Sequence, residues 1–203
     1  MRVGVLGGTF DPAHRGHLAL ARAARDELGL DELLFVPAGK PWRKAGRIVA
    51  PANHRLAMLR LALEGEAGFR VETLEMDRPG PSYTADTLEA LRAVRPGDEL
   101  FFVIGEDALA DLPNWVRPGR ILELATLAVA RREGVPKVAA ERLPGLSERI
   151  VWLKMPLLAV SATEIRDRVR RGLPVDDLVP PAVAAYIRER GLYRDDAASG
   201  GQG

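Results

Sequence analysis

The stretch from residue 3 to residue 17 constrains the fold more than any other part of the chain. It opens with a short apolar run typical of a buried strand. It then passes through Gly7-Gly8 and an Asp11-Pro12 turn and enters a helical pattern near residue 16. Glycines let backbone N–H groups approach an anion closely, and a helix start presents unpaired N–H groups and the positive end of the helix dipole. This order of elements predicts a phosphate-sized pocket.

His14 and His17 lie at the entrance of this helix and are two of only three histidines in the chain. Both can donate hydrogen bonds to phosphate oxygens, and their spacing of three lets the side chains point the same way. Each feature alone has a simpler interpretation. A glycine pair after a strand is more often a tight turn, and a single histidine is more often an ordinary surface or core residue. The chain has no cysteine, and no third ligand clusters with the histidine pair, so the sequence predicts no protein metal site.

Length and charge narrow the class of protein. A chain of 203 residues fits one domain with a sizeable core, and we expect that domain over 1–194, followed by a disordered, Gly-rich tail over 195–203. The net charge of +1 gives no basic field of the kind that nucleic-acid binders use. No apolar run approaches the roughly 20 residues that cross a bilayer, and the chain opens on a strand without a leader. These features predict a cytoplasmic protein that binds neither nucleic acid nor membrane.

Apolar runs and helical patterns alternate along the chain, which predicts an α/β fold with a parallel sheet. Beyond the opening strand, apolar or alternating runs predict strands over residues 33–37, 69–76, 100–105, 127–130 and 150–153. Amphipathic or capped segments predict helices from about 16 to 28, 52 to 63, 85 to 94, 162 to 171 and 181 to 190.

Four further segments carry polar or aromatic residues with both a structural and a functional interpretation. Thr84 suits the N-cap of the helix that follows it. Asp107 follows the strand ending at Gly105, so it either caps the next helix or meets a ligand at the carboxyl edge of the sheet. Trp115 could be a core residue. Ser161 and Glu164 have capping-box spacing, which predicts a helix start, and Arg166 just beyond them could bind phosphate.

The full motif Gly-Gly-Thr-Phe-Asp-Pro-x-His-x-Gly-His over residues 7–17 resembles the signature of the nucleotidyltransferase superfamily, in the longer form of bacterial nicotinate-nucleotide adenylyltransferases. The resemblance extends from Val3 to Tyr193. It implies a Rossmann-like parallel sheet flanked by helices, with a small C-terminal helical part that completes an ATP site. It also implies transfer of AMP from ATP to nicotinate mononucleotide, giving nicotinate adenine dinucleotide and pyrophosphate in NAD biosynthesis. Mg²⁺ is expected on the ATP phosphates, where it keeps most of its waters.

The same resemblance implies a role for individual residues. His14 and His17 would hold and polarise the phosphates, while Lys44 and Arg166 would offset developing charge. Lys40 stays an alternative, because Arg43-Lys44 stands where the family has His-Lys. The residues expected at ATP are Gly7, Gly8, Thr9, Phe10, His17, Gly105, Asp107, Ser161, Thr163 and Arg166. Those expected at the pyridine nucleotide are Tyr83, Thr84 and Trp115. Ala162 replaces a serine of the family pattern and loses one hydroxyl.

Three alternatives stay open from the sequence. The first is a related adenylyltransferase that uses nicotinamide mononucleotide or phosphopantetheine. The second is a catalytically inactive nucleotide sensor, against which both histidines and Arg166 argue. The third, a nucleic-acid-binding module, is disfavoured by the charge balance. The expected partners are ATP and nicotinate mononucleotide, and a homo-oligomer is possible.

Overall fold

Six parallel strands form one sheet at the centre of the structure, a computed structural model that describes residues 1–40, 50–131, 146–154 and 160–194. The strand order is β3-β2-β1-β4-β5-β6. The strands are β1 (Arg2–Gly8), β2 (Glu32–Pro37), β3 (Phe69–Val71), β4 (Glu99–Gly105), β5 (Thr126–Ala130) and β6 (Ile150–Leu153). The strand β1 pairs with β2 on one side and with β4 on the other. Strands β2 and β3 therefore lie on one side of β1, and strands β4 to β6 lie on its other side. This is the strand order of doubly wound nucleotide-binding sheets.

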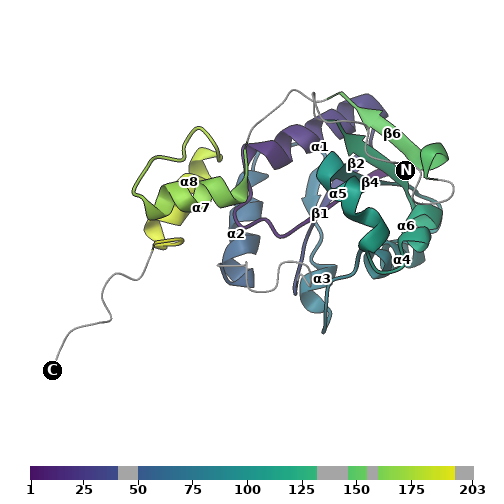
Figure 1. Cartoon of the computed structure of the whole chain (residues 1–203), viewed down its shortest axis with the longest axis horizontal. Helices are drawn as coiled ribbons and strands as arrows, with labels where there is room; N and C mark the ends of the chain where they lie inside the picture. The colour runs from purple at the N-terminus through teal and green to yellow at the C-terminus, as the bar shows by residue number, and fades with distance from the viewer. Residues whose placement is uncertain (41–49, 132–145, 155–159, 195–203) are drawn as a thin grey trace.

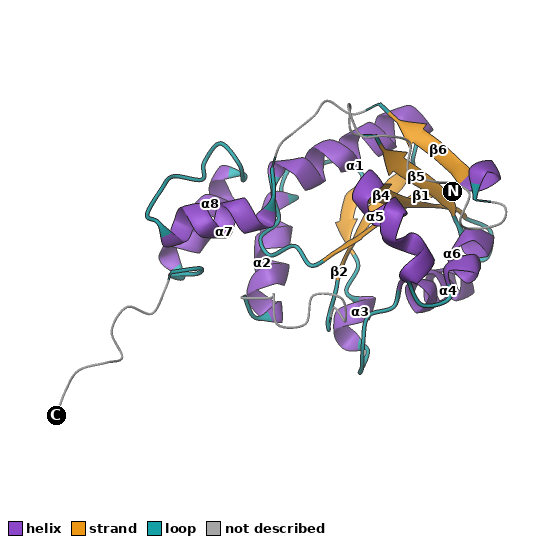
Figure 2. Ribbon diagram, in the orientation of Figure 1, coloured by secondary structure: helices purple, strands orange, loops and turns teal. Residues whose placement is uncertain are grey.

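Helices cover both faces of the sheet, with α1 on one side and α4 and α6 on the other (Figure 2). The helices are α1 (Arg15–Leu28), α2 (Ala52–Ala62), α3 (Leu74–Asp77), α4 (Thr84–Val94), α5 (Glu106–Asp111), α6 (Pro118–Leu124), α7 (Ala162–Arg170) and α8 (Pro181–Glu189). The 3₁₀ turns among the described residues are η2 (Leu112–Asn114) and η4 (Ser147–Arg149). The predicted Rossmann-like α/β fold is confirmed.

The strand β2 shows why these residues form a central strand. All of its residues are buried, and successive side chains enter opposite cores. Leu33 and Phe35 pack in the core beneath α1 and α2, whereas Leu34 and Val36 pack in the core beneath α4 and α6. A strand buried on both faces needs a nearly continuous apolar run, which is what the sequence has here.

The helices α7 and α8 lie together beside α2, at one end of the molecule (Figure 1). Val183 and Ile187 of α8 belong to the same core as Met58 and Leu59 of α2. The predicted small C-terminal helical part is therefore present and is packed onto the rest of the fold. The predicted tail over 195–203 lies outside the described residues, and the single domain over 1–194 stays a prediction.

Two predictions about local structure are wrong. The alternating run 69–76 is not one strand, because β3 ends at Val71 and α3 begins at Leu74. The Thr73 hydroxyl donates to the Asp77 carboxylate at 2.8 Å, which closes a helical turn where the pattern favoured a strand. Thr84 is the first residue of α4 and not its N-cap, a position that Tyr83 occupies.

Ser161 is the N-cap of α7, as its spacing to Glu164 predicted, and its hydroxyl accepts from the Glu164 N–H at 3.1 Å. We expect Ser161→Ala to lower the free energy of unfolding by about 1 kcal/mol, because one helix N–H loses its acceptor. Ser161→Asn, which can still cap, should restore most of that loss. Urea unfolding monitored by circular dichroism checks both values, and equal stability of the alanine variant and the wild type would contradict the role of the cap.

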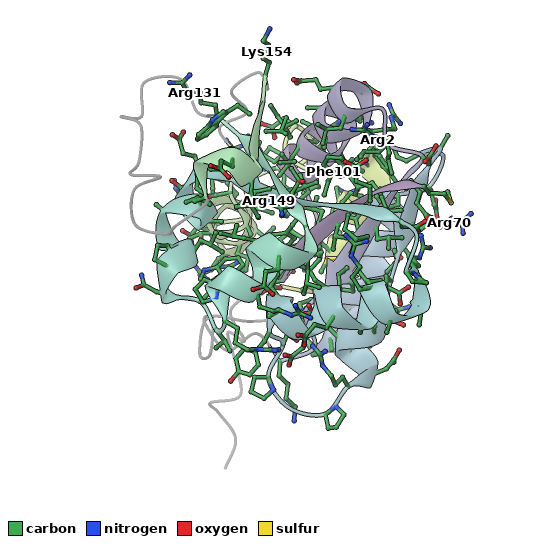
Figure 3. All side chains as sticks on the ribbon, turned by 90° about the vertical axis from the view of Figure 1, so that its right-hand side faces the viewer. Arg2, Arg70, Phe101, Arg131, Arg149 and Lys154 are labelled. Atoms are coloured by element: carbon green, nitrogen blue, oxygen red, sulfur yellow. The ribbon has the colours of Figure 1, made fainter. Side chains whose placement is uncertain are left out.

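The amino ends of the strands are tied together by charged side chains. The Arg2 guanidinium lies 4.9 Å from the centre of the Phe101 ring, and the two residues are adjacent in Figure 3. The Met1 amino group donates to Asp98 at 2.9 Å, and the Arg95 guanidinium contacts Glu32. This end of the sheet is therefore closed by ion pairs. The carboxyl ends are where the fold leaves room for a ligand.

Candidate active site

A cavity of about 550 Å³ lies at the carboxyl ends of β1 and β4. Its wall includes Gly7 and Gly8 at the end of β1 and Gly105 at the end of β4. The strand order diverges between these two strands, and open α/β sheets bind ligands at such a switch point. The volume is in the range of small-molecule sites.

The turn after β1 is tightly built around the Phe10 ring. Phe10 is buried and has a positive φ of 50°, which is uncommon for a residue other than glycine. A Cβ on Gly8 would lie 2.9 Å from the Phe10 ring, so a larger residue there would force the ring to move. The ring also meets His17 edge-on, with centroids 4.9 Å apart. Gly8, Phe10 and His17 therefore form one packed unit beside the cavity.

His14 and His17 stack with their ring centroids 3.6 Å apart. His14 is the N-cap of α1 and its N–H donates to the His17 Nδ1 at 3.2 Å. The prediction that the two side chains lie together is confirmed. His17 lines the cavity, whereas His14 is buried behind it with 8% of its surface exposed.

The helix α7 reaches the turn of residues 9–11, which follows β1, through Arg166. Its Nη1 donates to the Asp11 carbonyl at 2.8 Å, and its Nη2 lies 3.3 Å from the Thr163 hydroxyl. Ser161 and Thr163 are exposed at the start of the same helix and do not line the cavity. The structure thus brings the second sequence motif to the first, although 155 residues separate Arg166 from Asp11.

Aromatic and hydroxyl side chains also line the cavity. Trp115 and Thr84 line it, and the Trp115 indole N–H donates to the Asp111 carboxylate at 3.1 Å, which fixes the orientation of the ring. The same ring meets Phe102 edge-on, with centroids 6.1 Å apart. Tyr83 is half-buried next to Thr84 but does not line the cavity.

Of the other predicted residues, Asp107 and Lys40 are exposed. Asp107 is exposed in the first turn of α5 and does not line the cavity, so its predicted contact to adenosine stays a prediction. Lys44 lies outside the described residues. Lys40, its alternative, is exposed just after the loop that leaves β2.

Sequence reasoning missed a buried polar cluster made by Arg55, Asp11 and Tyr193. The side chains of Arg55 and Tyr193 bond to the turn of residues 9–11. Arg55 is 1% exposed, and its guanidinium donates to the Thr9 carbonyl at 2.8 Å and to the Gly39 carbonyl at 3.3 Å. The Asp11 carboxylate accepts from the Tyr193 hydroxyl at 2.8 Å and from the Ala50 N–H at 3.3 Å. One signal was available, because Arg55 shares the buried stripe of α2 with Met58, Leu59 and Ala62.

Burial sets the protonation of this cluster. It lowers the pKa of Arg55, and the negative charge of Asp11 opposes that shift. Burial also raises the pKa of Tyr193 far above its usual value, and the Asp11 carboxylate adds to the effect. Tyr193 is therefore a neutral phenol at physiological pH, and it acts as a hydrogen-bond donor to Asp11.

The sequence analysis also missed a close contact between Gly39, in the loop after β2, and Glu75 of α3. A Cβ on Gly39 would lie 2.2 Å from the Glu75 carbonyl oxygen, so only glycine fits. The Gly39 N–H donates to the Ser82 hydroxyl at 3.1 Å, and the Glu75 carboxylate accepts from the Thr87 hydroxyl at 2.5 Å. These bonds position the segment before α4 against the cavity. Nothing in the local sequence pattern pointed to them.

Across residues 1–40, 50–131, 146–154 and 160–194, no three His, Cys, Asp or Glu side chains gather as metal ligands would. Within the same ranges, no helix combines the length and the apolar character needed to cross a bilayer.

A sequence model of the cytidylyltransferase-like family matches residues 5–168. A protein of Thermomicrobium roseum named "Probable nicotinate-nucleotide adenylyltransferase" is 45% identical over 95% of this chain and 92% of its own length. A protein of Roseiflexus sp. with the same name is 47% identical, over 95% of this chain and 98% of its own. Among solved structures, the nicotinic acid mononucleotide adenylyltransferase of Plasmodium falciparum complexed with NaAD matches with a TM-score of 0.78 at 17% identity, over 95% of this chain and 97% of its own, which supports the fold.

Proposed function

The chain belongs to the cytidylyltransferase-like family, and from that premise we propose that it is a nicotinate-nucleotide adenylyltransferase of NAD biosynthesis. The phosphate oxygen of nicotinate mononucleotide attacks the α-phosphorus of ATP. A new P–O bond forms as the bond between the α-phosphorus and the β-phosphate oxygen breaks. The products are nicotinate adenine dinucleotide and pyrophosphate.

The observation that carries this proposal is the lining of one cavity by two kinds of group. Gly7, Gly8 and His17 form the kind of surface that binds phosphates, with backbone that a ligand can approach closely and a hydrogen-bonding imidazole. Thr84 and Trp115 of the same cavity offer a polar group and a flat aromatic face suited to a pyridine ring. A dinucleotide product needs both kinds of group.

In-line transfer to phosphorus needs positioning and charge neutralisation and no covalent nucleophile. We assign His17 to the phosphates directly, because it borders the cavity, with His14 stacked behind it. Arg166 would add positive charge from α7, and Lys44 or Lys40 would add it from the loop after β2. Ser161 and Thr163 would contact the phosphates from the start of α7, while Gly105 and Asp107 would border the adenosine.

Mg²⁺ would arrive bound to ATP, and the ion would neutralise phosphate charge there. Mg²⁺ retains several waters and needs only one or two protein oxygens. The protein's own contribution is to orient the phosphates and exclude water. A cytoplasmic location and a homo-oligomeric assembly stay predictions.

Pyrophosphate release from ATP and Mg²⁺ tests the proposal against the other adenylyltransferases. We expect release with nicotinate mononucleotide, and a kcat/KM at least about 10²-fold lower with nicotinamide mononucleotide, because a donor that pairs with a carboxylate oxygen would face the amide NH2, another donor. Phosphopantetheine should give no release. Release with phosphopantetheine alone would overturn the assignment, and ATP binding without turnover of any acceptor would favour a nucleotide sensor.

A further inference from the structure

Two arginines from different helices donate hydrogen bonds to backbone carbonyls of the turn of residues 9–11. Arg55 of α2 donates to the Thr9 carbonyl, and Arg166 of α7 donates to the Asp11 carbonyl, both at 2.8 Å. Phe10 lies between these two carbonyls at a φ of 50°. A residue other than glycine keeps such a conformation only where its surroundings enforce it.

The direction of the Thr9 carbonyl fixes the direction of the next N–H. The Thr9–Phe10 peptide is trans, so the Thr9 C=O and the Phe10 N–H point in opposite directions. Because the carbonyl points to the buried Arg55, the Phe10 N–H points to the side of the turn opposite Arg55. A turn whose carbonyls are held inward can offer its N–H groups to an anion.

Tyr193 supports this turn through Asp11. The Asp11 carboxylate is 4% exposed and lies 4.0 Å from the Arg166 guanidinium, and it accepts from the Tyr193 hydroxyl at 2.8 Å. Tyr193 is itself 6% exposed and comes 182 residues later in the chain. A buried carboxylate held by an ion pair and by a donated O–H has few alternative orientations.

We propose that Tyr193 and Arg55 are positioning residues for the nucleotide phosphates: acting through Asp11 and Thr9, they fix the turn of residues 9–11 so that the Phe10 N–H meets the phosphates of ATP. The proposal rests on the proposed function and deepens it. Neither side chain lines the cavity, so each acts through the turn. The C-terminal segment thus contributes to ATP binding without touching ATP.

Tyr193→Phe tests the proposal, with Tyr186→Phe as the matched control. Both variants remove one hydroxyl from the C-terminal segment, but the Tyr186 hydroxyl bonds His54 at 2.9 Å and not Asp11. We expect Tyr193→Phe to lower kcat/KM for ATP about tenfold, the effect of losing one hydrogen bond to a charged group, while KM for nicotinate mononucleotide changes less than about twofold. Tyr186→Phe should leave both values within about twofold of the wild type.

Calorimetric binding of α,β-methylene-ATP separates failure of this inference from failure of the proposed function. Tyr193→Phe should weaken that binding by about the same tenfold, whichever acceptor the wild type uses. In the double variant Asp11→Asn/Tyr193→Phe the two losses should be less than additive, because both act on one contact. Binding by Tyr193→Phe equal to that of Tyr186→Phe would overturn the proposal, and so would strict additivity or an equal loss for both substrates.

Discussion

His17→Ala is expected to lower kcat/KM with ATP and nicotinate mononucleotide by about 10²–10³-fold. His17 is the histidine that lines the cavity, and removing one preorganised donor to a developing negative charge has an effect of this size. ATP binding should weaken much less than turnover, since most phosphate contacts would come from backbone groups and Arg166. Steady-state kinetics and calorimetry with α,β-methylene-ATP measure the two effects separately.

His54→Ala is the matched control for that variant, because His54 is the remaining histidine and contacts Tyr186 on α8. It should keep kcat/KM within about threefold of the wild type, as distant substitutions usually do. His17 also accepts the His14 N–H at 3.2 Å, so thermal unfolding of His17→Ala must be compared with the wild type. A folded His17→Ala variant with nearly normal turnover would contradict the assignment, and an equal loss of binding and turnover would reduce His17 to a binding residue.

Arg55→Leu is expected to lower the free energy of unfolding by about 3–5 kcal/mol. Arg55 is the positive partner of a buried cluster, and removing one member of such a cluster leaves the buried Asp11 charge less compensated. The Thr9 and Gly39 carbonyls lose their donors at the same time. Urea unfolding followed by circular dichroism and by tryptophan fluorescence measures the change.

Arg60→Leu is the control for that substitution, since Arg60 is on the same helix but exposed. It removes the same charge and should change stability by less than about 0.5 kcal/mol. A loss below about 1 kcal/mol for Arg55→Leu would show that the buried cluster contributes little to stability.

Much of the fold was predictable because the central strands are apolar on both faces. The runs at β2 and β4 are buried throughout or nearly so, and such runs are visible in sequence. The prediction of one strand over 69–76 was wrong, because this segment contains a helical turn that the hydrogen bond from Thr73 to Asp77 closes. Local side-chain bonds of this kind compete with the apolar pattern and are not read from periodicity.

The site residues also differ in whether the local sequence could predict them. Gly8 and His17 were predictable because one compact motif over residues 7–17 carries both, and Arg166 because it follows the helix-start pattern at Ser161 and Glu164. The structure brings Arg166 to the turn that the first motif forms. Arg55 and Tyr193 were not, because their partners are the Thr9 carbonyl and the Asp11 carboxylate, 46 and 182 residues away. Only the tertiary fold brings such groups together, although the position of Arg55 on an apolar helix stripe was a usable sign.

The central claim is that this cavity transfers the adenylyl group of ATP to nicotinate mononucleotide. Its most direct test supplies ATP labelled at the α-phosphate, with Mg²⁺ and equal concentrations of nicotinate and nicotinamide mononucleotide, and follows the label by chromatography. The label should appear in nicotinate adenine dinucleotide, at least about 10²-fold ahead of NAD. Label that stays in ATP, or that enters NAD first, would contradict the claim.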